Sequence, residues 1–220
     1  MLYNQLDSKN LYNMLSNGYR NLSLMEQTVN DLNVFPVPDG DTGTNMVKTL
    51  AGGVAIDAEA FSDVSSMMKQ FSKSVLLAAR GNSGVILSQY IRGWSNAVAD
   101  KTVLCVSDIK EMLTQGVECA YSAVPNPVEG TMLTVLREPA EALQLQNDFP
   151  DFKAVFSCII ENMKTSLQNT PELLPVLKDA GVVDSGGMGI IYFMEGMWAY
   201  LNGEIIESDS NRESSIILSP

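Results

Sequence analysis

Histidine is absent from this chain of 220 residues, and cysteine is scarce. Without an imidazole, serine and cysteine triads and the usual zinc sites are excluded. The three cysteines, Cys105, Cys119 and Cys158, lie far apart and form no Cys-x-x-Cys pair, so we expect reduced thiols instead of a disulfide framework. Any metal ion bound by this chain must therefore be held by oxygen ligands.

Positive charge is also scarce, because 14 Lys and Arg residues face 26 Asp and Glu residues, a net charge of -12. Nucleic acids and anionic membranes need a positive protein surface, so neither is an expected partner. An anionic ligand would need metal ions beside it. No apolar run approaches the roughly 20 residues of a membrane span, and residues 1–10 lack a signal pattern. We expect a cytoplasmic protein without integral membrane contact.

The apolar residues, 45% of the chain, recur at helical spacing, and no segment shows sustained strand alternation. We expect an all-α fold of about eight helices in one domain, residues 1–203. Residues 204–220, rich in Ser, Asp, Asn and Glu, are expected to be a linker or loose tail. Among the expected helices are residues 46–56, 85–98, 108–124, 132–144 and 187–201.

Single residues predict several helix boundaries. Ser107 is a candidate N-cap, and Thr170 is predicted to cap a short helix with Pro171 at its first position and Gly181 after its end. Pro139 is expected to kink or break its helix.

Glycine and polar residues gather at four junctions, residues 36–45, 80–84, 129–131 and 184–187, each just before an expected helix. A helix N-terminus offers free backbone N–H groups and a partial positive charge. If several of these starts meet at one end of the bundle, they form a cradle for phosphate.

Asp39 and Asp41 flank Gly40 on a segment stiffened by two prolines, so both carboxylates can project into one concavity. Magnesium prefers about six oxygen ligands, a few of them carboxylates and the rest waters or substrate phosphates. Asn33 is a candidate third protein oxygen. A lone Pro-Asp-Gly sequence is typical of an ordinary turn. Here two carboxylates, two hydroxyls and an amide fall within residues 39–45, which favours a metal site.

Plainer interpretations of the other clusters stay open. Thr44 or Asn45 could simply be a helix cap, and residues 80–84 could simply be a turn between helices. Met132 could lie in the core, although a soft methionine beside exposed backbone also suits a nucleotide base. Ser83, between two glycines, would let backbone N–H groups approach a phosphate closely. No Walker sequence occurs.

Together the four clusters resemble the nucleotide-binding domain shared by the L subunit of dihydroxyacetone kinase and the N-terminal domain of bacterial fatty acid kinase, the closer match. The resemblance spans about residues 5–202. It is carried by NVFPVPDGDTGTNM at 33–46, ARGNSGVILSQ at 79–89, PVEGT at 127–131 and GVVDSGG at 181–187.

The resemblance implies a barrel of about eight antiparallel helices with ATP or ADP and two Mg²⁺ ions at one end. Asp39 and Asp41 correspond to the catalytic metal ligands, with Asn33 as a further candidate. The implied phosphate contacts are Thr42, Gly43, Thr44, Asn45, Asn82 and Ser83. The implied nucleoside contacts are Ala123, Gly130, Thr131 and Met132. Asp184, Ser185 and Gly186 correspond to the loop that closes the site.

The implied reaction transfers the ATP γ-phosphate to the carboxylate of a fatty acid, presented by a separate fatty-acid-binding carrier protein, to give an acyl phosphate. The family enzyme has further C-terminal domains that help to engage the carrier. Arg80 and Arg137 are either helpers of the leaving phosphate or surface ion-pair residues.

Two alternatives remain. One is a dihydroxyacetone-kinase-type subunit that keeps ADP as a cofactor; that branch has an aspartate five residues before the position of Asp39 and a histidine at the position of Thr42, whereas here Asn33 lies six residues before Asp39. The other is a non-enzymatic nucleotide-binding module, because no side chain is an obvious general base.

Overall fold

The computed structural model describes residues 4–207. Within them are ten α-helices, one short 3-10 helix (Ala58–Ala60) and two strands of two residues each, β1 (Gln5–Leu6) and β2 (Leu104–Cys105). The α-helices are α1 (Ser8–Leu24), α2 (Glu26–Asp31), α3 (Thr42–Val54), α4 (Val64–Ala78), α5 (Gly81–Ala97), α6 (Asp108–Ser122), α7 (Met132–Gln144), α8 (Phe152–Leu173), α9 (Pro175–Ala180) and α10 (Ser185–Leu201).

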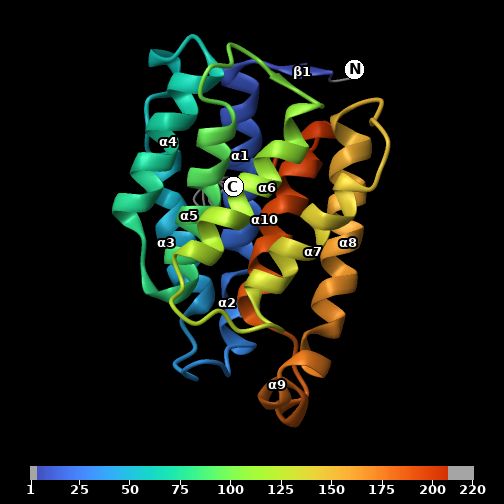
Figure 1. Cartoon of the computed structure of the whole chain (residues 1–220). Coiled ribbons are helices and arrows are strands. Elements are labelled where there is room, and N and C mark those ends of the chain that lie inside the picture. The colour runs from blue at the N-terminus through green and yellow to red at the C-terminus, as the bar shows by residue number, and fades with distance from the viewer. Residues whose placement is uncertain (1–3, 208–220) are drawn as a thin grey trace, which may run out of the picture.

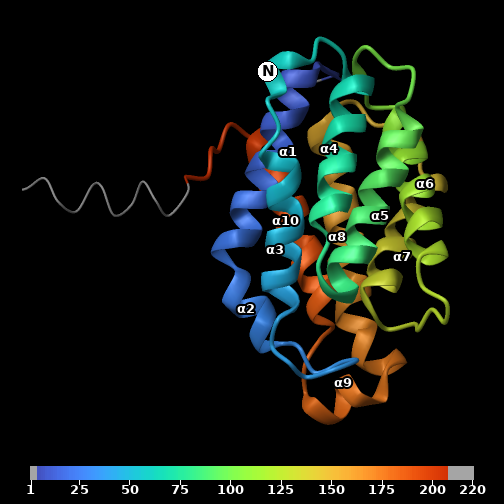
Figure 2. The same ribbon diagram turned by 90° about the vertical axis from the view of Figure 1, so that its left-hand side faces the viewer.

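Eight of these helices form a closed ring in the order α1, α3, α4, α5, α6, α7, α8 and α10, and α10 packs back on α1. Neighbours in the ring run in opposite directions, and the short helices α2 and α9 lie at one end (Figures 1 and 2). The predicted all-α barrel is therefore confirmed. Because every second helix of an up-and-down arrangement starts at the same end, α3, α5, α7 and α10 all begin at the end that carries α2 and α9.

The barrel is filled by the apolar residues that recur at helical spacing. Phe71, Trp94 and Phe193 are among the fully buried side chains, and the rings of Trp94 and Phe193 stack with centroids 6.3 Å apart. Helices α1 and α10 approach closely where Gly18 meets α10, because a Cβ on Gly18 would lie only 2.6 Å from the carbonyl oxygen of Phe193. Burying one large apolar side chain contributes about 1.5–3 kcal/mol, so this filled interior is the main source of stability.

Three helices begin earlier than the sequence predicts. Helix α3 starts at Thr42 instead of residue 46, α5 at Gly81 instead of residue 85, and α10 at Ser185 instead of residue 187. Glycine and short polar residues destabilise helix interiors. They are tolerated in a first turn, because the N–H groups there have no intrahelical partner to lose. Residues expected to precede these helices therefore form their first turns.

Pro139 is expected to kink or break its helix, and the break does not occur. Helix α7 continues through this residue to Gln144, although proline forfeits one backbone hydrogen bond. Its neighbours Leu136, Ala140 and Leu143 are buried, and tertiary packing of such a face stabilises a helix more than local propensity does.

The predicted helix start at Thr170 and Pro171 is also wrong. Both residues lie inside α8, and α9 begins four residues later with Pro175 at its first position. Gly181 does end α9, with a left-handed φ of 67°. Ser107 precedes α6 as predicted, but its side chain makes no capping hydrogen bond.

The sequence did not predict two short structural features. Strand β1 pairs with β2 in antiparallel fashion, with Gln5 opposite Cys105, but two residues are too few for a strand pattern. The first residues of the expected tail are held to α1, because Asn17 Nδ2 donates to the carbonyl of Glu204 and the N–H of Ile206 donates to Asn17 Oδ1. Positions 208–220 lie outside the described residues. None of the described helices is long and apolar enough to cross a membrane.

Candidate functional site

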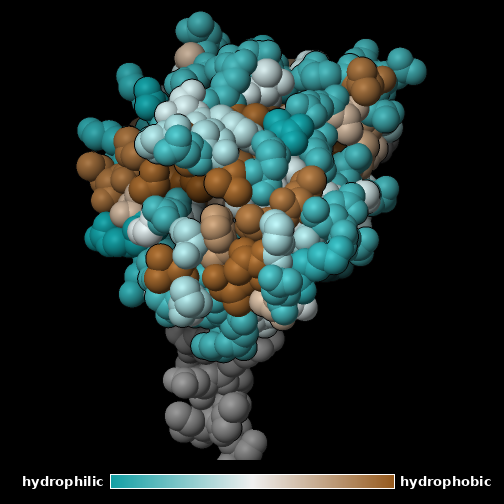
Figure 3. Space-filling model, turned by 60° about the horizontal axis from the view of Figure 1, so that its bottom comes forward, coloured by the Kyte–Doolittle hydropathy of each residue, from teal (hydrophilic) through white to brown (hydrophobic). Residues whose placement is uncertain are grey.

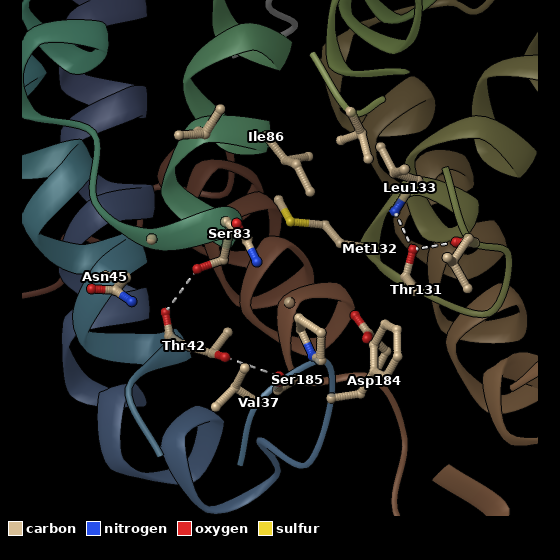
Figure 4. Close-up of a pocket in the computed structure, with 18 of the residues that line it drawn as sticks. Val37, Thr42, Asn45, Ser83, Ile86, Thr131, Met132, Leu133, Asp184 and Ser185 are labelled. Atoms are coloured by element: carbon tan, nitrogen blue, oxygen red, sulfur yellow. Dashed lines mark hydrogen bonds between the residues drawn. The ribbon is translucent and has the colours of Figure 1, made fainter. Parts of the chain in front are cut away.

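A cavity of about 490 Å³ opens at the end of the barrel where α3, α5, α7 and α10 begin. Residues from the first turns of these four helices line it, together with the loop 33–41 and the segment 123–128 (Figure 4). The predicted convergence of the four junction clusters is therefore observed. Figure 3 looks toward this end and shows apolar side chains gathered on it.

Helix α3 begins with an aspartate that leaves its helix uncapped. Asp41 occupies the N-cap position, yet its carboxylate accepts no hydrogen bond from the first turn. By contrast, Asp7, Asp63 and Asp151 cap α1, α4 and α8 through their side chains. Asp41 lines the cavity, and its carboxylate is not used by the first turn of α3.

Helix α5 presents its first turn beside that of α3. Gly81 has a left-handed φ of 60°, and a Cβ there would collide with the side chain of Asn45. Ser83 Oγ lies 3.5 Å from the carbonyl oxygen of Thr42, which joins the two first turns. Arg80 precedes the helix without capping it, and its guanidinium donates to the carbonyl of Ala79.

Helix α10 is joined to α3 by a pair of hydroxyls. Ser185 Oγ donates to Thr42 Oγ1 over 3.2 Å, and both residues are buried. Asp184 Oδ2 accepts from the N–H of Gly187 at 2.8 Å and so caps α10. Burial raises the pKa of Asp184 to about 6, although hydrogen bonds from the N–H groups of Gly187, Met132 and Gly186 oppose the shift.

Asn33 and Asp39 are directly linked on the loop that precedes α3. Asn33 Nδ2 donates to Asp39 Oδ1 over 2.9 Å, while Asn33 Oδ1 is buried and has no hydrogen-bond partner among the described residues. An unpaired buried acceptor costs about 1–3 kcal/mol, so this oxygen calls for a donor or a cation.

The donor set fits a hard cation such as Mg²⁺, since it consists of the carboxylates of Asp39 and Asp41 and the amide oxygen of Asn33. No group of three or more His, Cys, Asp or Glu side chains that could hold a metal occurs in residues 4–207. Two carboxylates match the few protein ligands that Mg²⁺ usually takes when phosphates and waters complete its shell.

Any positive potential in the cavity comes from backbone N–H groups, because the charged side chains that line it are the aspartates Asp39, Asp41 and Asp184. Of the described residues that line it, none is Lys or Arg. A bound anion would therefore meet helix N-termini and any metal held by the aspartates.

Part of the cavity lining is apolar, and the sequence prediction missed most of it. The additional lining residues are Phe35, Pro36, Val37, Gly81, Val85, Ile86, Val124, Pro125, Asn126, Val128 and Leu133. Val37, Val85 and Val128 are exposed apolar side chains. Apolar residues inside a loop or at a helix start are the sequence signal that could have indicated this part of the lining. A flat apolar group would fit against this wall while an attached anion reaches the helix starts.

Most of the residues predicted for the site do line the cavity. They are Asn33, Asp39, Asp41, Thr42, Asn45, Asn82, Ser83, Ala123, Thr131, Met132, Asp184, Ser185 and Gly186. Their binding roles stay predictions.

Gly43, Thr44 and Gly130 are not among the lining residues. Gly43 packs against the backbone of Glu26, and Thr44 Oγ1 donates to Glu26 Oε1 at 2.5 Å, so both hold α3 to α2. The N–H of Thr44 is also used, because it donates to Asn30 Oδ1. Gly130 turns the chain with a φ of 78°, packed against Leu173.

The chain matches proteins whose own roles are mostly unassigned. It is 44% identical over 203 residues to protein YloV of Bacillus subtilis, covering 91% of this chain and 37% of that protein. It is 42% identical over 220 residues to an uncharacterised protein of Staphylococcus saprophyticus, covering 98% of this chain and 40% of that one. An uncharacterised Staphylococcus aureus protein is 42% identical over 209 residues, covering 94% and 38%. The chain thus spans about two fifths of the length of these relatives.

Residues 36–199 match the DAK2 domain, and this region contains the four helix starts that form the cavity. The DAK2 domain resembles the L subunit of dihydroxyacetone kinase and is associated with kinases. With most of its length matched, the chain belongs to the DAK2 domain family.

Proposed function

We propose that this chain is the nucleotide-binding domain of a fatty acid kinase. In this reaction the γ-phosphate of ATP is transferred to the carboxylate of a fatty acid held by a separate fatty-acid-binding carrier protein, which yields an acyl phosphate and ADP. Because the chain spans about two fifths of its relatives, turnover is expected to need further domains of the same enzyme.

The observation that carries the proposal is the meeting of four helix N-termini and a set of hard oxygen ligands in one cavity with an apolar wall. The helix starts suit a phosphate chain, the oxygens suit magnesium, and the wall suits a nucleoside. No cationic side chain among the described residues lines the cavity, so the phosphate charge would be balanced by helix N-termini and cations.

Asn33, Asp39 and Asp41 would hold the magnesium, and two ions are expected. When bound, such ions would supply positive charge that offsets the negative charge developing on the phosphates during transfer. The first turns of α3 and α5 would orient the phosphate chain through their N–H groups, and the hydrogen bond between Ser185 and Thr42 holds the start of α10 to that of α3.

A general base is not required by this proposal. The carboxylate of a fatty acid is ionised near neutral pH and can attack phosphorus without losing a proton, so position and charge can supply the catalysis.

The decisive experiment measures acyl phosphate formation by the full-length enzyme with ATP, Mg²⁺, carrier and fatty acid. Wild type is compared with Asp39→Ala and Asp41→Ala, and with Asp31→Ala, which changes an exposed carboxylate on α2 as a matched control. We expect product from wild type and from the Asp31 variant only.

Two other outcomes would redirect the assignment. Phosphorylation of tightly held ADP by a phosphocarrier protein would identify a dihydroxyacetone-kinase-type subunit. Binding of Mg-ATP with no transfer in the complete system would identify a non-enzymatic nucleotide-binding module.

A further inference from the structure

Arg137 is not among the residues that line the cavity, but it fastens the segment that forms part of the cavity wall. Its Nε donates to Tyr121 Oη over 3.1 Å, and its Nη2 donates to Glu129 Oε2 over 2.9 Å. Tyr121 Oη in turn donates to Glu129 Oε1 over 2.9 Å, so the three side chains form a triangle of hydrogen bonds. One guanidinium thus joins the last turn of α6 to the approach to α7.

Tyr121 and Glu129 lie at the two ends of one segment. Tyr121 lies in the last turn of α6, and Glu129 lies three residues before α7 begins at Met132. After α6 ends at Ser122, the chain up to Glu129 has no helix or strand, and most of these residues line the cavity. They are Ala123, Val124, Pro125, Asn126 and Val128.

Glu129 is held by a second contact from inside the barrel. Thr134 is fully buried, its Oγ1 donates to Glu129 Oε2 over 2.6 Å, and it accepts from the N–H of Gly130 over 2.8 Å. Burial acts to raise the pKa of Glu129, but hydrogen bonds from Thr134, Arg137 and Tyr121 outweigh it and hold the pKa below its ordinary value. Glu129 is therefore held by three side chains, Thr134, Tyr121 and Arg137, and Arg137 is the cationic one.

We infer that Arg137 is a positioning residue for the nucleoside end of the cavity, acting through Glu129 and Tyr121 to hold the wall of residues 123–128. This inference rests on the proposed nucleotide-binding function. In this inference the two ends of the nucleotide bind different segments. The phosphates bind at the starts of α3, α5 and α10, which Arg137 does not contact. The nucleoside binds at the segment that Arg137 holds.

The contacts argue against the other two roles considered for Arg137. Its guanidinium is committed to Tyr121, Glu129 and Glu141, and it does not line the cavity, so it is not placed to meet a phosphate. Glu141 and Glu138 are surface ion-pair partners of Arg137, with side chains 62% and 38% exposed. Exposed pairs of this kind contribute little to stability. Glu129 is also partly exposed, but the buried Thr134 holds it as well.

The test compares two probes on the full 220-residue chain by calorimetry with excess Mg²⁺: ADP, which has a nucleoside, and pyrophosphate, which has none. In Arg137→Met, which keeps the aliphatic stem without donors, we expect ADP to bind about tenfold more weakly and pyrophosphate to bind within about twofold of wild type. Glu141→Gln removes only the outward ion pair and is the matched control, with both affinities unchanged.

A purely structural role predicts a different pattern. Equal weakening of both probes, or no weakening of ADP, would overturn the inference. Tyr121→Phe removes two sides of the triangle and keeps the ring, so it is expected to show the same selective loss even if Arg137→Met does not fold. In a Glu129→Gln background, Arg137→Met should have a smaller effect than in wild type. Failure of the proposed function would give another result, because wild type itself would then not bind ADP. That result would contradict the inference as well.

Discussion

Asn33 donates its side-chain N–H to Asp39 Oδ1 over 2.9 Å and keeps its own Oδ1 buried without a partner. The amide is thus oriented by one carboxylate and leaves one oxygen unused. Since a buried acceptor without a donor is costly, a bound cation that takes this oxygen stabilises the loop as well as the ligand.

Replacing Asn33 should therefore weaken metal binding selectively. In Asn33→Ala we expect the Mg²⁺ concentration needed for half-maximal ADP binding to rise about tenfold, or ~1.4 kcal/mol. Titration of Mg²⁺ at fixed ADP measures it. Asn162→Ala, which loses a hydrogen bond to the carbonyl of Cys158 on α8, should leave the titration unchanged. An unchanged titration in Asn33→Ala would exclude Asn33 as a ligand.

Replacing either aspartate should remove the effect of Mg²⁺ on nucleotide binding. For wild type we expect Mg²⁺ to strengthen ADP binding, because the carboxylates of Asp39 and Asp41 hold the cation beside the phosphates. Asp39→Ala and Asp41→Ala should bind ADP equally with Mg²⁺ or with EDTA. Calorimetry under both conditions measures this, with Asp31→Ala as control. A persistent response to Mg²⁺ in both variants would place the metal elsewhere.

Asp184 should make stability fall as pH rises. Its pKa in the folded protein is about 6, above the ordinary value, so between pH ~4 and ~6 the folded state binds more protons than the unfolded state. The free energy of unfolding should lose about 2–3 kcal/mol across that window. In Asp184→Asn this loss should disappear, as measured by urea unfolding from pH 4 to pH 7 in EDTA.

Asp63 offers a contrast of opposite sign. It caps α4 from a partly exposed position, and hydrogen bonds from the side chain and backbone of Ser66 lower its pKa. Its contribution is present above the ordinary pKa of an aspartate and is lost as pH falls through the lowered value. Asp63→Asn should therefore reduce stability mainly at neutral pH. If Asp63→Asn and Asp184→Asn changed the pH profile in the same direction, the assignment for Asp184 would be wrong.

Gly18 should not tolerate a methyl group. An added Cβ would lie 2.6 Å from the carbonyl oxygen of Phe193 and 2.8 Å from its ring, so α1 and α10 would have to separate. We expect Gly18→Ala to lower the free energy of unfolding by about 1–3 kcal/mol, measured by denaturant titration. Gln168→Ala on the exposed face of α8 should change it by less than about 0.5 kcal/mol. Wild-type stability in Gly18→Ala would show that the two helices can move apart freely.

Local pattern in the sequence was enough for the class of fold and for one half of the cavity. Helical periodicity predicts all-α structure because each helix exposes one face and buries the other. The polar clusters around Asp39, Ser83 and Asp184 mark helix starts for an equally local reason, since first-turn N–H groups have no partner in their own helix. Gly181 ended its helix as predicted because a left-handed residue favours glycine.

Errors arose where packing outweighed local preference. Pro139 stays inside α7 because the buried face of that helix offsets one lost hydrogen bond, and Thr170 serves as an acceptor for the N–H of Asp184 instead of starting a helix. The starts at Thr42 and Gly81 were placed four residues late, since glycine weakens a helix interior but not a first turn.

The sequence by itself determined the all-α class and the clusters of polar groups near the helix starts, because those properties depend on neighbours within a few residues. Only the tertiary structure decided that four of these starts share one cavity, that Val37 and Val128 wall it, and that Arg137 braces the wall from outside. These relations join residues far apart in the chain, and they follow from the closure of α10 on α1 and the alternating direction of the helices between them.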